Sequence, residues 1–317
     1  MKFKHTLSLV TCVYGVEEYI EQYAHSVFGQ TCTDIEYIFV NDGTKDNSIQ
    51  ILERVIDEHY AHLRSNIIIL NQINQGLPLA RKSGISLAKG DYILFADPDD
   101  WLSPNAVEEI LTKADETDAD IIYFNLVKEY GHRQSIKREK HYTAETKELW
   151  IENIFNYKSF GYCVTKCFRH SLYTDNTIYT PILGMHEDIY LMSQIIFYAK
   201  SIVQMPKVLY HYRKTNKDSM CSQSSSTRHI ASSRNLLNLY QNYMQDIANS
   251  PIRRVANGIL FRAGWHALLH GYNFTKEYPW FVDAIRQAQM STRYQATLPQ
   301  QMLVKVAAKI SPKLFCR

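Results

Sequence analysis

The sequence predicts an α/β protein built on a mostly parallel sheet flanked by helices and followed by a helical C-terminal extension. Short apolar runs alternate with amphipathic stretches through the first third of the 317 residues, a pattern typical of strand–helix–strand units. Strand signals end near Ser224, whereas helical periodicity continues to the C-terminus. Hydrophobic residues make up 45% and charged residues 21%, which is enough apolar material for a buried core.

The first third contains four predicted strands and three predicted helices in strict alternation. The strands are expected over residues 6–12, 35–40, 67–70 and 92–96, and the helices over 17–28, 46–60 and 77–88. Parallel sheets bind ligands at the carboxyl ends of their strands. We therefore expect chemistry in the residues that directly follow Cys12, Val40, Leu70 and Ala96.

The remaining two thirds of the chain give weaker signals. Ser103 and Pro104 predict a helix start that combines a capping hydroxyl with proline at the first helical position. The remaining pattern predicts a helix to about residue 117, a strand over 120–127, a polar hairpin or loop over 128–141, two short strands after 151, a helix over 187–199 and a strand over 208–213. The serine-rich segment 222–227 predicts a linker, which divides the chain into domains of residues 1–221 and 222–317.

Charge and cysteine content exclude several classes of protein. A net charge of +3 is too small for a nucleic-acid coat, so no nucleic-acid partner is expected. The longest apolar runs fall short of the roughly 20 residues that a spanning helix needs. The six cysteines are scattered and no apolar segment follows the start, which predicts a cytoplasmic protein.

Two aspartates directly after the fourth predicted strand are the leading functional candidates. In an extended chain, Asp97 and Asp99 project to the same side, so their carboxylates can converge. Converging carboxylates repel each other unless a cation lies between them, and Mg²⁺ or Mn²⁺ suits such a set of oxygen ligands. The alternative is a capped turn that precedes the next helix.

Three other polar clusters each allow a functional and a structural interpretation. Asp42 ends a strand and could accept hydrogen bonds from a nucleotide, or could serve the turn alone. Arg81 lies one turn into a helix whose N-terminus favours anions, or it is a solvated surface charge. Glu187 and Asp188 begin a helix, where one of them could act as general base or both could complement the helix dipole.

Several motifs together resemble the family-two glycosyltransferases in order and spacing. The resemblance is dense over about the first hundred residues and resumes further along; the matching segments are 8–20, 26–31, 39–46, 74–76 with 80–81, 91–100, 166–169, 187–188 and 209–213. It implies the GT-A fold, a Rossmann-like α/β fold, and transfer of a sugar from a nucleotide donor with inversion at the anomeric carbon.

The resemblance also implies roles for individual residues. Thr11, Val13 and Glu17 would line the nucleotide pocket, Asp42 would contact the base, and Arg81 would lie near the base or diphosphate. Asp97 would lie near the ribose or metal, and Asp99 would be the principal metal ligand. Asp188 would be the general base, with Glu187 less favoured, and His211 or Arg213 would close over the diphosphate. The implied cofactor is Mn²⁺ or Mg²⁺.

The predicted function is an inverting transfer of a hexose or N-acetylhexosamine from a UDP-sugar to a hydroxyl of a glycan or lipid-linked acceptor in cell-surface polysaccharide or lipopolysaccharide synthesis. The alternative is a catalytically inactive protein of the same fold that binds nucleotide-sugars or glycans. A nucleotidyltransferase would carry a basic glycine-rich loop after the first strand, where this chain has Thr11 to Gly15.

The C-terminal segment 302–317 is basic and amphipathic, with Lys305, Lys309, Lys313 and Arg317 among apolar residues. This pattern predicts either a peripheral contact with an anionic membrane, on the inner face of the cell membrane, or an ordinary packed helix with a frayed tail.

Overall fold

A computed structural model of the chain describes residues 3–138, 146–155, 159–180, 187–216, 233–235, 237–238, 240–241, 253–288, 290, 297–310 and 315. The chain forms two compact units. The first comprises Met1–Tyr142, Tyr162–Thr180 and Gln194–Ser222, and the second comprises Thr143–Gly161, Pro181–Ser193 and Gln223–Arg317. The predicted linker over 222–227 lies outside the described residues, and the domain boundary at 221 stays a prediction.

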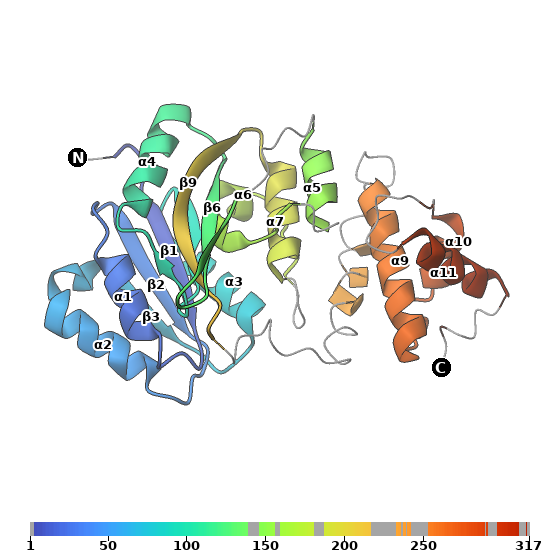
Figure 1. Ribbon diagram of the computed structural model, residues 1–317, viewed down its shortest axis with the longest axis horizontal. Helices are drawn as coiled ribbons and strands as arrows, with labels where there is room; N and C mark the ends of the chain where they lie inside the picture. The colour runs from blue at the N-terminus through green and yellow to red at the C-terminus, as the bar shows by residue number, and fades with distance from the viewer. Residues whose placement is uncertain are drawn as a thin grey trace. The chain divides into compact units, whose positions relative to one another are not determined.

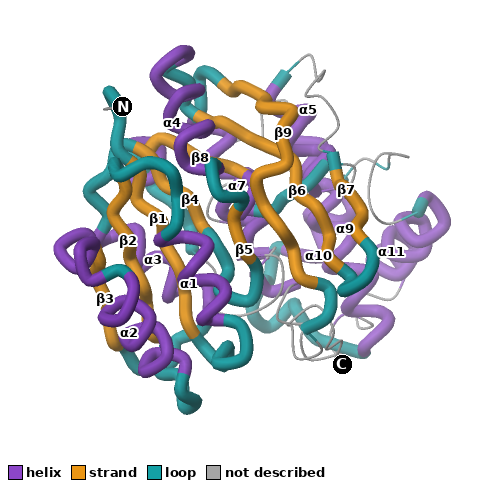
Figure 2. The backbone as a smooth tube through the Cα atoms, turned by 60° about the vertical axis from the view of Figure 1, so that its left-hand side comes forward, coloured by secondary structure: helices purple, strands orange, loops and turns teal. Residues whose placement is uncertain are grey.

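The first unit is built on a nine-stranded sheet whose first four strands are parallel, as the sequence predicts. Their order is β3 (Ile67–Asn71), β2 (Ile35–Asn41), β1 (Leu7–Val13), β4 (Tyr92–Phe95). Figure 1 shows β1, β2 and β3 side by side, and Figure 2 shows β4 next to β1. These strands are short apolar runs, and β1, β2 and β4 are almost completely buried. Burial on both faces explains why they are apolar at nearly every position rather than at every second one.

The rest of the sheet is mixed. It continues from β4 through β8 (Lys166–Arg169), β6 (Ile121–Glu129), β9 (Ile202–Arg213) and β5 (Trp101–Leu102), with β7 (Gln134–Lys137) paired to β6. The pair β6–β9 is parallel, whereas β4–β8, β6–β8, β6–β7 and β5–β9 are antiparallel. The predicted α/β class is confirmed. The alternation of strands and helices in the sequence did not predict the antiparallel half of the sheet.

Helices cover both faces of the parallel half. Figure 2 shows α1 (Ile20–Phe28) and α2 (Ser48–His59) on one face and α3 (Leu77–Leu87) on the other. This arrangement follows from right-handed crossovers, because the chain moves outward from β1 to β3 and then returns past β1 to β4. The helix α3 approaches the sheet closely at Gly84, where a Cβ atom would lie 2.4 Å from Val10 Cγ1.

Three expectations about individual elements are wrong. The helix α4 (Ala106–Thr117) begins after Asn105 rather than at Ser103, and the Ser103 hydroxyl does not cap it but contacts the Val208 carbonyl at 3.3 Å and His211 Nε2 at 3.2 Å. Two short strands were expected after residue 151, but the helix α5 runs over residues 147–155, and between there and α7 (Glu187–Tyr198) the described residues contain one strand, β8. The strand β9 begins six residues earlier than the predicted 208.

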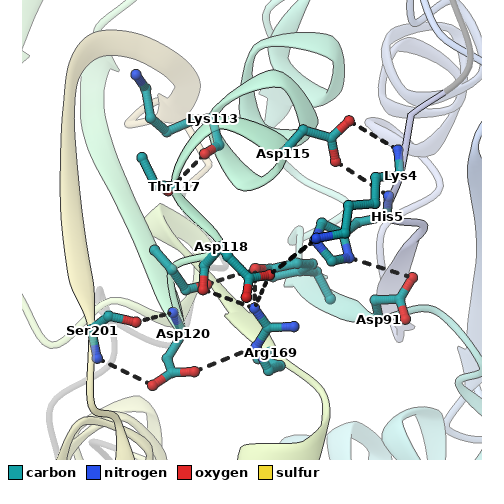
Figure 3. A network of polar contacts seen from close by, with 12 residues as sticks. Lys4, His5, Asp91, Lys113, Asp115, Thr117, Asp118, Asp120, Arg169 and Ser201 are labelled. Carbon is teal, nitrogen blue, oxygen red and sulfur yellow. Dashed lines mark hydrogen bonds and ion pairs between the residues drawn. The ribbon is translucent and has the colours of Figure 1, made fainter.

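A polar network closes the amino ends of β1 and β4, at the opposite edge of the sheet from the predicted site (Figure 3). The Arg169 guanidinium donates to the Asp118 carboxylate at 2.9 Å and to the Tyr92 hydroxyl at 3.0 Å, and it forms an ion pair with Asp120. His5 Nε2 lies 3.2 Å from the same Asp118 carboxylate. The hydrogen bond from Arg169 holds the pKa of Asp118 below its usual value. The network therefore joins four segments that are distant in sequence, at residues 5, 92, 118–120 and 169.

The second unit is helical in its described part, which confirms the helical character predicted for the C-terminal region. Its helices include α5 (Lys147–Phe155), α9 (Arg253–His270), α10 (Phe281–Gln287) and α11 (Leu298–Ile310), together with the first turns of α7 (Glu187–Tyr198). The close approach of α9 to α11 occurs at Gly264, where a Cβ atom would lie 2.6 Å from Val304 Cγ1. Within the described residues, none of the helices is both long enough and apolar enough to cross a membrane.

Candidate functional site

The candidate site lies at the carboxyl ends of the parallel strands, where the acidic turn of residues 97–100 follows β4. The backbone nitrogen of Asp100 donates to the Asp97 carbonyl at 3.1 Å, which closes a tight turn. Asp97 and Asp99 are partly exposed, whereas Asp100 is only 1% exposed. The turn thus presents two carboxylates outward and buries the third.

Asp100 anchors the acidic turn to β9. The hydroxyl of the fully buried Tyr210 donates to Asp100 Oδ2 at 2.7 Å and accepts from the Asp97 backbone nitrogen at 3.1 Å. The backbone nitrogen of Arg213 donates to Asp100 Oδ1 at 2.7 Å. Sequence reasoning missed both Asp100 and Tyr210, although they lie within the matching segments 91–100 and 209–213. The buried face of the strand that carries His211 and Arg213 was the signal for Tyr210.

Arg81 is an interior residue and not a surface charge. Its side chain is 6% exposed, and its guanidinium donates to Asp97 Oδ1 at 3.1 Å. The guanidinium also lies 5.4 Å from the centre of the Phe95 ring. A buried cation beside one carboxylate of a pair fixes that carboxylate in place and offsets part of the repulsion between the two.

Asp99 is held by groups from the end of β9 and the segment after it. Asn216 Nδ2 donates to Asp99 Oδ2 at 2.9 Å, and Arg213 Nε donates to the Asp99 carbonyl at 2.7 Å. Burial and then the charge of Asp97 raise the pKa of the Asp99 carboxyl above its usual value. Asn216 was also missed by sequence reasoning, and no signal in the chain marked it.

The acidic turn fits a divalent cation. Burial, followed by the neighbouring charges of Asp99 and Asp97, raises the pKa of Asp100 well above its usual value, so negative charge on adjacent carboxylates is unfavourable in this turn. Within the described residues, no cluster of three or more histidine, cysteine or acidic side chains is arranged to enclose a metal by itself. The donor set is therefore that of an open site, in which Asp99 and Asp97 would share the ion with oxygens of a bound ligand.

Asp42 organises the loop that precedes α3. Its carboxylate is 3% exposed and accepts hydrogen bonds from Gln72 Nε2 at 2.8 Å and from the backbone nitrogens of Gln75 and Gly76 at 2.9 Å each. Gly43 follows with φ of 69°, and a Cβ atom there would lie 2.9 Å from the nitrogen of Asn74. Asp42 therefore stabilises this turn, and the turn forms part of the surface where a nucleotide base is expected.

The other three residues expected around a nucleotide lie on or after β1. Thr11 is fully buried, and its hydroxyl shares a hydrogen bond with the Tyr23 hydroxyl inside the core. The Val13 carbonyl accepts from the Asp42 backbone nitrogen at 3.1 Å. Glu17 is exposed, and its carboxylate accepts from the backbone nitrogen of Asn47 at 2.9 Å. The structure therefore places Val13 and Glu17 beside the loop that follows β2.

His211 belongs to a pocket of about 340 Å³ beside the acidic turn, lined by Trp101, Glu129, Gly131, Gln134, His211, Arg213 and Thr215. The ring of His211 stacks on Trp101, with centroids 5.1 Å apart and planes inclined by 11°. Its Nδ1 lies 2.8 Å from Glu129 Oε1, and its Nε2 lies 3.2 Å from Ser103 Oγ. These contacts fix the orientation of the imidazole.

Arg213 links the acidic turn to α1. Its guanidinium lies 5.0 Å from the centre of the Tyr19 ring and 4.8 Å from that of Trp101, and it donates to Gln22 Oε1 at 2.6 Å. Together with the bond to the Asp99 carbonyl, these contacts make Arg213 a fixed cation at the edge of the site. Among the predicted residues, the structure brings together Arg81, Asp97, Asp99 and Arg213.

Glu187 and Asp188 lie in the second unit, in the first turn of α7. Asp188 Oδ1 accepts a hydrogen bond from the backbone nitrogen of Ile189 at 2.9 Å, and the pair complements the helix dipole. The roles implied for them remain predictions.

Solved structures with the same fold bind nucleotide-sugars. The chain is similar to the structure of S. aureus TarS 1-349 in complex with UDP-GlcNAc, with a TM-score of 0.65 and 19% identity over 96% of this chain and 81% of that one. It is also similar to the mannosyltransferase PcManGT from Pyrobaculum calidifontis in complex with GDP-Man and Mn²⁺, with a TM-score of 0.54 and 11% identity over 98% of this chain and 81% of that one. These similarities show that the fold is of the GT-A type.

The sequence itself identifies the family. Residues 8–175, just over half of the chain, match the glycosyl transferase family 2 profile, and the chain belongs to that family. The putative glycosyltransferase EpsH of Bacillus subtilis is 34% identical over 214 residues, which cover 65% of this chain and 60% of EpsH. The chain thus spans less than two thirds of the length of this relative.

Proposed function

We propose that the chain transfers a hexose or N-acetylhexosamine from a UDP-sugar to a hydroxyl of a glycan or lipid-linked saccharide, with inversion at the anomeric carbon. The observation that carries this proposal is the acidic turn, held at the carboxyl edge of the sheet by Tyr210 and Arg213 with Arg81 beside it. Family membership and the UDP-GlcNAc complex of TarS support the choice of donor.

The donor site is assigned to the loops after β1, β2 and β4. Asp42 holds the loop that faces the base, and its three hydrogen bonds keep that loop in one conformation before the nucleotide arrives. Arg81 and Arg213 supply fixed positive charge near the diphosphate. A preorganised charge of this kind stabilises the leaving group without reorganisation during the reaction.

Asp99 and Asp97 would hold Mn²⁺ or Mg²⁺ together with diphosphate oxygens. When bound there, the ion would neutralise the charge that develops on the departing diphosphate. The Mn²⁺ in the PcManGT complex and the mutual repulsion of the carboxylates in the turn support this assignment. Asn216 and the Arg213 side chain orient Asp99 by bonds to its carboxylate and its carbonyl.

Asp188 is assigned as the general base, with Glu187 as the less favoured candidate. In a single displacement the acceptor hydroxyl loses its proton as the oxygen bonds to the anomeric carbon, and the UDP leaves from the opposite face of the sugar. The Asp188 carboxylate would take this proton. The resemblance of these two acids to a family motif supports the assignment.

A panel of nucleotide-sugars with Mn²⁺ present, scored by UDP release with a saccharide acceptor, tests the proposal. Asp188→Asn should bind UDP with unchanged affinity and lose turnover by at least about a hundredfold, while Glu187→Gln should retain most of the rate. If Asp188→Asn turned over as fast as the native chain, the base assignment would be wrong. UDP binding without sugar transfer from any donor would instead indicate the inactive binding protein.

A further inference from the structure

The helix α11 has an apolar face that the second unit leaves uncovered. Its buried positions are Gln301, Val304 and Ala308, each fully inaccessible to solvent. Four large apolar side chains on the same helix are instead exposed: Leu298 at 43%, Met302 at 61%, Leu303 at 56% and Val306 at 42%. Exposed apolar residues are usually scattered singly, so four of them on one helix call for a partner.

These exposed side chains gather on the side of α11 that faces away from its buried stripe. At about 100° per residue, the buried positions span an arc of about 60°, and the exposed apolar positions span an arc of about 140° on the other side. Pro299, which is also exposed, falls within the second arc. An ordinary surface helix carries polar residues there. One side of α11 therefore packs inside the unit, and the opposite side presents apolar side chains to solvent.

The helix itself is well defined at its start. Thr297 and Gln300 form a reciprocal cap, in which the backbone nitrogen of Thr297 donates to Gln300 Oε1 at 2.7 Å and the backbone nitrogen of Gln300 donates to Thr297 Oγ1 at 3.4 Å. This capping box fixes the first turn and therefore the direction of the exposed face.

Positive charge accompanies the exposed face. Lys305 and Lys309 lie one turn apart along its edge, and Lys309 is exposed. After Asp283 the sequence contains no acidic residue, but it contains six cations, at Arg286, Arg293, Lys305, Lys309, Lys313 and Arg317. The whole chain carries only +3, so residues 1–283 are net negative and the positive charge is concentrated at this end.

We propose that α11 docks the chain on an anionic lipid bilayer, with Leu298, Met302, Leu303 and Val306 inserted at the headgroup boundary. A lipid surface is the occupant that matches both features, because it offers an apolar layer directly beneath a sheet of negative charge. The helix has 13 residues, which suits a position in the plane of the interface. This docking does not depend on the proposed transfer reaction, although a lipid-linked acceptor would lie at the same surface.

Cosedimentation of the full-length chain with vesicles tests the proposal. Vesicles of phosphatidylglycerol and phosphatidylcholine, mixed about 30 to 70, are compared with pure phosphatidylcholine vesicles in 0.1 M NaCl. We expect binding to the mixed vesicles, little binding to the neutral ones, and release as the salt concentration rises.

Variants separate the apolar face from the charge. Met302→Glu combined with Leu303→Glu should weaken binding at least about tenfold, since it places two anions at the anionic surface. Lys305→Gln combined with Lys309→Gln should weaken it by about fivefold per lysine and flatten the salt dependence. Ile136→Glu, at a side chain 50% exposed on β7, is the matched control and should bind as the native chain does. Circular dichroism and thermal melts confirm that each variant is folded.

Three results would overturn the proposal. The first is a native chain that stays in the supernatant with mixed vesicles, and the second is a folded Met302→Glu, Leu303→Glu variant that still binds them. The third is a native dimer, seen by sedimentation velocity, that the same double variant dissociates; it would assign the face to a second copy of the chain. UDP release with a soluble acceptor, measured in parallel, reports on the proposed function separately.

Discussion

Replacing Tyr210 by phenylalanine removes one hydroxyl and tests how the acidic turn is held. The hydroxyl lies in the core, where it donates to Asp100 at 2.7 Å and accepts from the backbone nitrogen of Asp97 at 3.1 Å. Since the Phe ring fills the same space, Tyr210→Phe changes these two contacts and little else. The variant therefore isolates the link between β9 and the turn.

The structure sets the size of the effect. A hydrogen bond to a carboxylate contributes about 1.5–3 kcal/mol and a neutral one about 0.5–1.5 kcal/mol. Loss of both, with Asp100 and a backbone nitrogen left short of a partner, should lower the free energy of unfolding by about 2–4 kcal/mol. Because the turn also carries Asp99, UDP affinity in the presence of Mn²⁺ should fall as well.

Urea unfolding measures the first effect and calorimetric UDP titration the second. Tyr37→Phe is the matched control, because Tyr37 is 2% exposed in the same sheet and its hydroxyl makes no hydrogen bond with the part of the chain that the structure describes. That variant should differ from the native chain by less than about 0.5 kcal/mol. A Tyr210→Phe protein as stable as the control, with native UDP affinity, would refute the anchoring role.

Three further substitutions test the fold and the nucleotide loop. Arg169 lowers the pKa of Asp118, so this pair stabilises the fold above the usual aspartate pKa, and the stabilisation is lost as the pH falls through the lowered value. Asp118→Asn should remove this acid sensitivity of the melting temperature, and a variant with the native pH profile would contradict the role of the pair. Asp42→Ala removes three accepted hydrogen bonds, so it should lower the free energy of unfolding in urea by about 2–4 kcal/mol and abolish UDP binding. A variant that binds UDP with native affinity would exclude this loop from the donor site. Gly84→Ala places a Cβ atom 2.4 Å from Val10 Cγ1 and should cost about 1–3 kcal/mol; an equal melting temperature would show that α3 can shift.

The parallel half of the sheet was predictable from the sequence because its strands are short apolar runs that alternate with amphipathic helices. The strand over 92–96 and the helix over 77–88 were located to within a residue of β4 and α3. The antiparallel strands, by contrast, pair across long distances in the chain. Local patterns do not encode such pairing, so β8 beside β4 and the start of β9 at Ile202 had to come from the structure.

The site residues that could be predicted from the sequence were charged side chains whose type and position at a strand or helix end indicate a function. Asp97 and Asp99 stood out as neighbouring acids after a strand, and Arg81 as a cation at a helix start. Their burial, their orientation and the supporting roles of Asp100 and Tyr210 depend on tertiary contacts. Nothing in the local sequence indicates that Asp100 faces inward while the neighbouring Asp97 and Asp99 face outward.

Calorimetric titration of UDP tests the assignment of Asp97 and Asp99 most directly. The native chain is titrated with Mn²⁺ present and again after chelation, and Asp99→Asn is titrated under both conditions. We expect the affinity of the native chain to fall at least about tenfold on chelation, and the variant to show the weak affinity in both. Equal affinity of the native chain with and without the metal, matched by Asp99→Asn, would contradict the assignment.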